Sequence, residues 1–198
     1  DRDLVTPLSE AAQGVGRLTV IHKDVLAVDF TRLAGEDKLR LVGNLPYNLS
    51  SPILFHAIEH AASIRDMVFM LQKEVVDRMA AEPGSKVYGR LSVMLQAYCR
   101  VDSLFVVPPG AFRPPPKVDS AVARLVPRAA DEVGIRDQRR FADVVRAAFG
   151  QRRKTLRNAL SGTCSVEQIE AAGLRPDLRA EQVPVSDFIR LANQPDAS

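Results

Sequence analysis

The 198-residue sequence contains no apolar run approaching the roughly 18 residues that a membrane helix requires. Its opening stretch, DRDLVTPLSE, has no apolar core of the kind found in a signal peptide. We therefore expect a cytoplasmic protein without a membrane partner. Apolar residues make up 46% of the sequence and charged residues 26%, which is typical of a folded globular chain rather than a disordered or fibrous one.

Cysteine and metal-ligand patterns are also scarce. Cys99 and Cys164 lack the paired spacing of a metal site or a disulfide framework, so we expect reduced structural thiols. His56 and His60 are four residues apart and could share a metal on one helix. They have no third ligand nearby, and their acidic neighbour, Glu59, does not follow the first histidine, so we expect surface histidines and no metal.

The formal net charge of +3 is too small to indicate a nucleic-acid partner by itself. Its distribution is more informative, because residues 136 to 157 hold eight basic side chains against two acidic ones. The stretch FGQRRKTLRNAL gathers four of them on one expected helix: Arg152, Arg153, Lys154 and Arg157. We interpret this cluster as a contact to RNA phosphates, the alternative being a solvated helix face.

Strand and helix patterns alternate along the first two thirds of the chain. Short branched-aliphatic runs predict strands at 17–25, 39–45 and 66–71, and helical spacing predicts helices at 51–62, 72–82 and 88–99. Two further strands, at 102–107 and 118–126, have only a proline-rich loop between them. That loop is too short for a parallel crossover, so we predict an α/β sheet that ends in an antiparallel hairpin.

Strand patterns stop after Arg128. The stretch AADEVGIRD reads as a linker, and helical patterns follow at 138–149, 151–161, 165–172 and 185–193. The sequence therefore predicts two domains, an α/β domain at 1–128 and a small all-helical domain at 129–198.

The sequence GNLPYNLSSP follows the apolar run at 39–45. In open α/β sheets the ligand lies beyond the carboxyl ends of the strands, where Asn44, Leu45, Pro46 and Tyr47 are expected. An Asn side chain offers an acceptor and a donor without charge, a proline leaves its own and the neighbouring carbonyl free, and a tyrosine ring can stack on a planar group. A nucleobase with an exocyclic amine fits this set.

An amine of that kind is a poor nucleophile because its lone pair is delocalised into the ring. If Asn44 and a backbone carbonyl hold both of its protons, the lone pair can be aimed at an electrophile, so orientation does most of the work. The alternative is an ordinary turn, in which Ser51 caps the following helix and Pro52 occupies its first position.

Five stretches, GNLPYNLSSPILF, FMLQKEVVDRM, YGRLSVMLQAYC, VPPGAFRPPPKVDSAVARLVPR and FGQRRKTLRNAL, together resemble one family. It is the bacterial small-subunit ribosomal RNA adenine-N6,N6-dimethyltransferase family, the KsgA/RsmA family, and the likeness runs to about residue 193. The resemblance implies a Rossmann-like class I methyltransferase sheet. It also implies S-adenosylmethionine as methyl donor and two adjacent adenines near the 3′ end of 16S ribosomal RNA as target, with the small ribosomal subunit as partner. The sequence does not define the oligomeric state, and we expect the intact protein to be a monomer.

The resemblance also implies roles for individual residues. Asn44 would touch the target amine and the methyl donor, with Leu45 and Pro46 completing that edge and Tyr47 stacking on the adenine. Phe112 would cover the other face of the base, the alternative being a hydrophobic plug in its loop. Separately, Asp24 would accept from the amine of the donor's adenine, the alternative being a helix cap.

One part of the family pattern is missing. Members begin with a strand, a glycine-rich loop for the donor and a second strand that ends in a ribose-binding acid. Gly14 and Gly16 precede an expected strand instead of following one, so they do not match that loop. We therefore expect a family member without its N-terminal donor segment, which binds S-adenosylmethionine weakly or not at all and is inactive on its own.

Two other functions remain open at this point. One is an adenine methyltransferase of large-subunit RNA, of the macrolide-resistance type, which shares the strand-end residues. The other is a non-catalytic assembly or quality-control factor that binds immature small subunits, a role that would need no donor loop.

Overall fold

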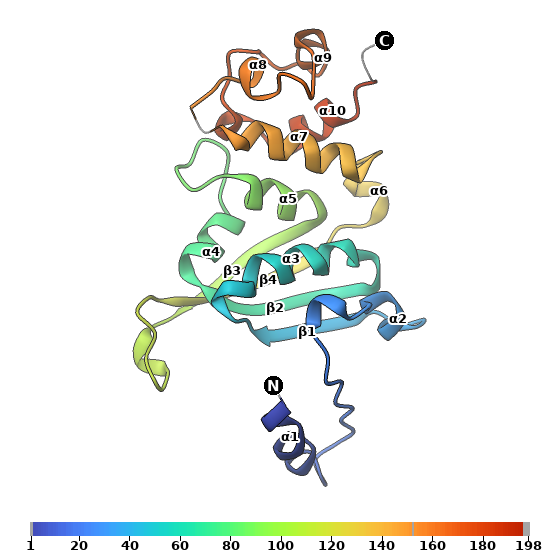
Figure 1. Cartoon of the computed structure of the whole chain (residues 1–198), viewed down its shortest axis with the longest axis vertical. Coiled ribbons are helices and arrows are strands. Elements are labelled where there is room, and N and C mark those ends of the chain that lie inside the picture. The colour runs from blue at the N-terminus through green and yellow to red at the C-terminus, as the bar shows by residue number, and fades with distance from the viewer. Residues whose placement is uncertain (1, 152, 196–198) are drawn as a thin grey trace.

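The computed structural model describes residues 2–151 and 153–195. Its centre is a four-stranded sheet with the strand order β1-β2-β4-β3 (Figure 1). The strands are β1 (Leu39–Asn44), β2 (Ile64–Gln72), β3 (Cys99–Val107) and β4 (Ser120–Pro127). β1 and β2 are parallel, and β4 runs antiparallel to both β2 and β3. The expected α/β sheet with a closing antiparallel hairpin is thus confirmed.

Helices lie on the sheet and beyond one side of it. They are α1 (Val5–Ala11), α2 (Phe30–Ala34), α3 (Ser50–Glu59), α4 (Lys73–Met79), α5 (Arg90–Tyr98), α6 (Ala130–Val133), α7 (Gln138–Gly150), α8 (Leu156–Ala159), α9 (Val166–Ala171) and α10 (Val185–Ala192). α5 lies between the sheet and α7, α8 and α9 lie on the far side of α7, and α10 packs against both α7 and α5 (Figure 1). No helix in the described ranges is long and apolar enough to cross a membrane.

The strand expected at 17–25 is wrong. Residues 16–24 form no regular structure, and a short 3-10 turn at Val25–Ala27 follows. A strand forms when its backbone pairs with a neighbour, and within the described residues β1 pairs with β2 alone. The N-terminal segment runs away from the sheet, with α1 at its far end (Figure 1), and Val42 on β1 is 72% exposed.

Two helix expectations are also corrected. α8 covers four residues rather than the predicted 151–161, because tertiary hydrogen bonds end the helical pattern. Thr155 pairs with Arg179 in an isolated antiparallel bridge, and the Leu156 amide donates to the Leu178 carbonyl over 2.7 Å. α3 begins at Ser50, so Ser51 is not its cap.

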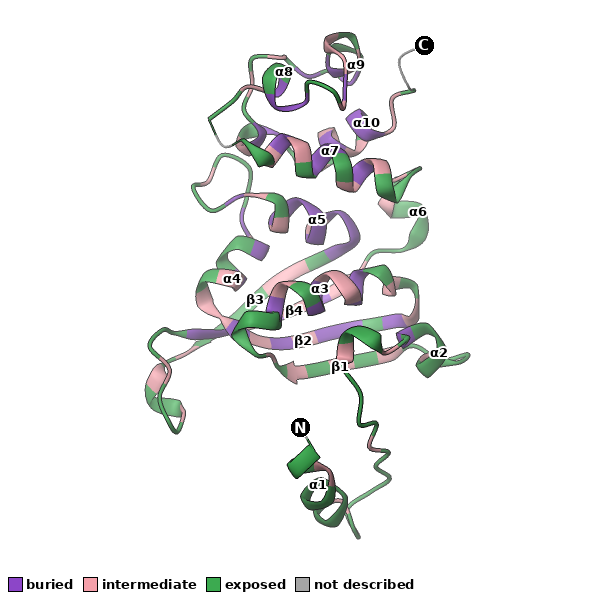
Figure 2. Ribbon diagram, viewed as in Figure 1, coloured by how far each residue is buried: buried purple, intermediate pink, exposed green. Residues whose placement is uncertain are grey.

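Buried side chains continue from the sheet through α5 into the helical region (Figure 2). The rings of Tyr98 and Phe141 meet with centroids 6.2 Å apart, and the Tyr88 hydroxyl donates to the Val183 carbonyl over 2.9 Å. These contacts join segments on both sides of residue 128. The division into domains at 1–128 and 129–198 stays a prediction, and its two parts share one core.

Both cysteines are buried and form no disulfide within the described residues. Burial raises the pKa of Cys99 to about 12, against an opposing effect of the Arg128 charge, so this side chain stays a neutral thiol. This environment agrees with the expected structural role.

An ion triad ties three strands together at the end of the sheet where β2 begins. The buried Asp66 carboxylate accepts from Arg40 on β1 over 2.7 Å and from Arg124 on β4 over 3.0 Å. The Arg40 hydrogen bond, followed by Arg124, holds the pKa of Asp66 below its usual range. The two arginine side chains offset the free-energy cost of burying the Asp66 carboxylate, and the triad aligns β1 with β2.

We expect Asp66→Asn to lower the free energy of unfolding by roughly 1–3 kcal/mol at neutral pH, as measured by urea denaturation. The folded-state pKa lies below the unfolded value, so the stabilisation is present above the unfolded pKa and is lost as pH falls through the folded pKa. The two proteins should therefore converge in acid. Asp143→Asn, at an exposed i,i+3 pair with Arg146, should cost about 0.5 kcal/mol or less. Equal losses in both variants would contradict a special role for Asp66.

Candidate active site

The strand end of β1 places the predicted site residues at an open edge of the sheet. Asn44 pairs with Met70 as the last residue of β1, and the Leu45 amide donates to the Met70 carbonyl over 3.1 Å. A 3-10 turn at Tyr47–Leu49 then leads directly into α3. Because the two strands are parallel, their carboxyl ends meet at one edge, which is where α/β sheets bind ligands.

Two neutral oxygens are available at this edge. Asn44 is exposed, and its side-chain amide has no hydrogen-bond partner among the described residues. The Pro46 carbonyl, expected to be free, already accepts from the Leu49 amide over 3.0 Å and from the Ser50 hydroxyl over 3.1 Å. That expectation was wrong. The Leu45 carbonyl accepts no hydrogen bond in the described part of the chain, so it is the backbone oxygen beside Asn44.

The hydroxyl of Tyr47 has a hydrogen-bond partner, while its ring is partly exposed to solvent. Its hydroxyl lies 3.0 Å from the hydroxyl of Ser120, the buried first residue of β4. The side chain remains 38% exposed, and no other described aromatic ring stacks on it. The hydrogen bond restricts the ring, while its exposed surface can take a planar ligand.

Phe112 belongs to the loop between β3 and β4. This loop projects from the sheet at the end where β1 and β2 finish (Figure 1). The Phe112 side chain is half-buried and its amide donates to the Pro109 carbonyl over 3.1 Å. In the described residues no ring contact joins Phe112 to Tyr47, so the structure does not bring the two rings together.

Asp24 caps a turn, which was the alternative to its predicted contact with the methyl donor. Its carboxylate caps the 3-10 turn that follows, accepting from the Leu26 amide over 3.0 Å. No hydrogen bond links Asp24 to Asn44 or Tyr47 within the ranges the structure describes. One carboxylate oxygen is thus engaged locally, and the predicted contact with the donor's adenine remains untested.

The two histidines are not surface residues as expected. Their side chains are only 15% and 20% exposed, because the Phe30 ring packs on His56 and His60 with centroids 5.1 and 5.6 Å away. His56 Nε2 lies 2.8 Å from the Val28 carbonyl. In the described residues no group of three or more potential ligands could hold a metal ion.

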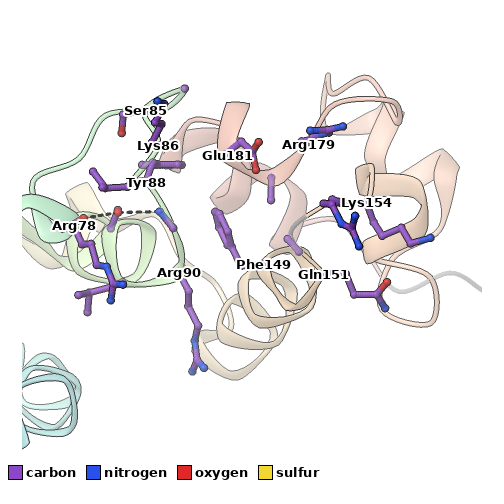
Figure 3. Close-up of a pocket in the computed structure, with 18 residues that line it drawn as sticks. Arg78, Ser85, Lys86, Tyr88, Arg90, Phe149, Gln151, Lys154, Arg179 and Glu181 are labelled. Atoms are coloured by element: carbon purple, nitrogen blue, oxygen red, sulfur yellow. Dashed lines mark hydrogen bonds between the residues drawn. The ribbon is translucent and has the colours of Figure 1, made fainter. Parts of the chain in front are cut away.

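A basic pocket of about 750 Å³ opens between the loop before α5, the end of α7 and the turn at Ala180–Gln182 (Figure 3). Its lining includes six cationic side chains, Arg78, Lys86, Arg90, Arg153, Lys154 and Arg179, against the single carboxylate of Glu181. Chain segments distant in sequence therefore share one positive field, which attracts a polyanion.

Aromatic side chains line the interior of this basic pocket. Tyr88 and Phe149 lie between the cations, with ring centroids 6.1 Å apart (Figure 3). Burial, and to a smaller extent the charge of Asp187, raises the pKa of Tyr88, so its phenol stays neutral. Arg90 also extends over Phe55, with its guanidinium carbon 5.5 Å from the ring centroid.

The predicted basic cluster is divided by the turn before α8. Arg153 and Lys154 lie in that turn and line the basic pocket, whereas Arg157, on α8, is not among the lining residues. Arg152 lies outside the described residues. The predicted common helix for these cations was therefore wrong, although two of them do share one site.

Comparisons with known proteins agree on one family. The model of the family described as ribosomal RNA adenine dimethylase matches residues 1–196. A protein named ribosomal RNA small subunit methyltransferase A from Xanthomonas campestris pv. campestris (strain B100) is 74% identical over 193 residues, covering 98% of this chain and 74% of that protein. The chain belongs to the ribosomal RNA adenine dimethylase family.

Other relatives agree with this membership. The protein of the same name from Xanthomonas axonopodis pv. citri (strain 306) is also 74% identical, with the same coverage. A dimethyladenosine transferase from Plasmodium falciparum has a TM-score of 0.81 at 23% identity, covering 96% of this chain and 78% of that one. The 23S rRNA methyltransferase ErmE has a TM-score of 0.70 at 24% identity, covering 97% and 78%. These two structures bear on the fold alone.

Membership of the adenine dimethylase family confirms three expectations. The chain has the class I methyltransferase fold, it is an enzyme of the rRNA adenine dimethyltransferase class, and its family uses S-adenosylmethionine as methyl donor.

Sequence reasoning missed four cations of the basic pocket. Arg78, Lys86, Arg90 and Arg179 are scattered over a hundred residues and form no run. The stretch SKVYGR holds two of them, and its glycine and charges were a usable signal of an exposed basic loop.

We expect the hydroxyl pair of Tyr47 and Ser120 to be energetically coupled. Tyr47→Phe and Ser120→Ala should each lower the free energy of unfolding by about 0.5–1.5 kcal/mol, and the double variant should lose less than the sum. Urea denaturation of the four proteins of this cycle measures the coupling. Strict additivity would show that the 3.0 Å contact does not hold the ring.

Proposed function

We propose that the protein uses S-adenosylmethionine to dimethylate the N6 atoms of two adjacent adenines near the 3′ end of 16S ribosomal RNA, in assembling small subunits. The observation that carries the proposal is the pair of unengaged oxygens at the end of β1, on the Asn44 amide and the Leu45 carbonyl. The names of the 74% identical relatives support the small-subunit target.

The reaction needs an adenine amine whose lone pair points at the methyl donor. Asn44 Oδ1 and the Leu45 carbonyl would accept its two hydrogens, which favours a tetrahedral nitrogen and lowers the cost of leaving conjugation. Tyr47 would stack on the extruded base and replace part of the stacking lost from RNA. Phe112, on the projecting loop, would cover the opposite face, and Pro46 fixes the turn between these groups.

S-adenosylmethionine supplies an electrophilic methyl group on a sulfonium ion. In this chain Asp24 and Asn44 are the residues proposed to meet it, and they fit in chemical type. The Asp24 carboxylate retains acceptor capacity beyond its bond to the Leu26 amide, and the Asn44 amide is unengaged. The expected absence of a glycine-rich donor segment, with weak donor binding, stays a prediction that calorimetry can test.

The basic pocket is the proposed contact to ribosomal RNA. Arg153 and Lys154 are supported by their neighbours Arg78, Lys86 and Arg179, which concentrate charge around two aromatic rings. Arg152 and Arg157 remain part of the proposal on sequence grounds. A cytoplasmic location and a monomeric state are likewise predictions.

We expect Asn44→Ala to reduce methyl transfer by at least about 100-fold while leaving binding of small subunits unchanged, because the amide positions the amine without contributing to the basic field. Transfer of tritiated methyl groups to unmethylated small subunits measures the effect. Asn48→Ala, an exposed asparagine in the following turn, is the matched control and should keep its activity. Inactivity of an unaltered protein that binds both S-adenosylmethionine in calorimetry and small subunits tightly would favour a non-catalytic assembly factor. Labelling of large-subunit RNA instead would favour the macrolide-resistance type.

We expect Arg153→Glu combined with Lys154→Glu to weaken small-subunit binding and to reduce the slope of log affinity against log salt by about 1.5, since two phosphate contacts are lost. Arg146→Glu is the control, because Arg146 is exposed on α7, outside the basic pocket, and pairs with Asp143. A titration series at increasing salt gives the slope. If the control changes the slope as much as the double variant, general charge rather than the pocket explains binding.

A further inference from the structure

A second, open groove lies beside the candidate active site. It has a volume of about 500 Å³ and is formed where β2 ends, where α4 begins and where the loop from Pro109 returns to β4. Its polar lining consists of Gln72, Lys73, Glu74, Asp77, Lys117 and Asp119. This mixed-charge groove adjoins the basic pocket at Val87, which lines both, and it has no role in the mechanism above.

The mixed-charge groove is adjacent to the proposed site of the target base. Gln72, in its lining, pairs across the sheet with Ser120, whose hydroxyl meets that of Tyr47 over 3.0 Å. The Lys73 amide donates to the Asp119 carbonyl over 2.9 Å, which joins α4 to the start of β4. A nucleotide next to the target adenine in the same RNA strand would therefore reach this groove.

Three of the five charged groups in the groove are already paired. The Lys73 ammonium lies 2.6 Å from the Asp77 carboxylate, and Glu74 lies 2.8 Å from Arg78. Lys117 and Asp119 have no side-chain hydrogen bond or ion pair to any residue that the structure describes.

The groove therefore presents one free ammonium and one free carboxylate, with the Gln72 amide nearby. Two lysines face three carboxylates, so the groove has no excess of positive charge for a phosphate.

An uncharged, planar ligand with acceptors on one edge and donors on another fits this set. Guanine has the adjacent donors N1–H and N2–H₂, which a carboxylate can bind together, and the acceptors O6 and N7, which a lysine can bind. Adenine and cytosine each set one amine beside a ring nitrogen lone pair, and uracil sets one donor between two carbonyls, so a carboxylate meets repulsion on all three.

We propose that the mixed-charge groove binds a guanine base next to the target adenine, with Asp119 accepting from N1–H and N2–H₂ and Lys117 donating to O6 or N7. Val87 and Val118 would flank the ring as apolar walls. The inference rests on the proposed function, because it takes the target base to enter at Tyr47. It makes Asp119 and Lys117 specificity-determining residues.

The test uses RNA hairpins that present one loop adenosine, with guanine, inosine, adenine, cytosine or uracil on its 5′ or 3′ side. Fluorescence anisotropy at fixed salt measures their binding to the 198-residue protein. The guanine hairpin of one polarity should bind about tenfold more tightly than the adenine, cytosine and uracil hairpins. Inosine, which lacks the N2 amine, should fall between them.

Asp119→Asn should reduce the preference for guanine to less than about twofold, because an amide cannot accept from both donors. Asp102→Asn is the matched control, since that aspartate lies on β3 and pairs with Arg100, and it should keep the tenfold preference. Lys117→Met should weaken guanine binding and Lys117→Arg should restore it.

The outcomes separate this inference from the proposed function. Equal binding of all bases, no binding of any hairpin, or a preference that survives Asp119→Asn would overturn the guanine groove. Methyl transfer to the hairpins is followed in the same samples. Transfer without a base preference would sink the groove alone. A preference without transfer would support the groove, and it would count against the proposed function where calorimetry shows that the same protein binds S-adenosylmethionine.

Discussion

The parallel pairing of β1 with β2 is the constraint on which the site depends. The ladder runs from Arg40 beside Asp66 to Asn44 beside Met70, and the Leu45 amide makes one further bond before the chain turns away. A slip of one residue would exchange the two faces of β1, moving Asn44 off the open edge and a leucine onto it. The buried Asp66 carboxylate, with its two arginine partners on the neighbouring strands, opposes such a slip. The ion pairs of Asp66 at one end of β1 and β2 thus help to fix the position of the uncharged Asn44 at the other end.

In the proposed function, two surfaces divide the recognition of RNA by the chemistry of their side chains. The basic pocket gathers six cations from four segments of the chain, an arrangement suited to phosphates. The mixed-charge groove is nearly neutral and has fixed donors and acceptors, which suits the edge of one base. The basic pocket can supply binding affinity that depends on salt. The mixed-charge groove can determine which nucleotide of the RNA strand reaches the active site. An enzyme that modifies only two adjacent adenines in a long RNA would need both, because phosphate contacts carry no sequence information.

Sequence reasoning succeeded where the chemistry is local and failed where it depends on a partner segment. The position of Asn44 to Tyr47 at a strand end was predicted correctly because a strand pattern ends there and a helical one begins within ten residues, while their roles stay predictions. The strand expected at 17–25 has the right composition, but a strand needs a neighbour to bond, and the described residues provide none. The helix expected through Lys154 was lost to tertiary bonds, the bridge from Thr155 to Arg179 and the Leu156 amide to Leu178. No local pattern could have shown that Arg179 lies near Lys154.

In the proposed reaction, the absence of charge at the end of β1 is itself part of the chemistry. A carboxylate in place of Asn44 would bind an amine hydrogen more tightly, but it would also retain the proton that the amine must release once the methyl group has arrived. A neutral amide and a neutral carbonyl orient the same two hydrogens, but neither is a strong enough base to keep the proton that the amine releases. Orientation alone then has to supply the rate, so the groups around the base must be held still. The bond from Tyr47 to Ser120 and the two bonds on the Pro46 carbonyl do this, because they fix the turn through elements that are themselves buried or paired.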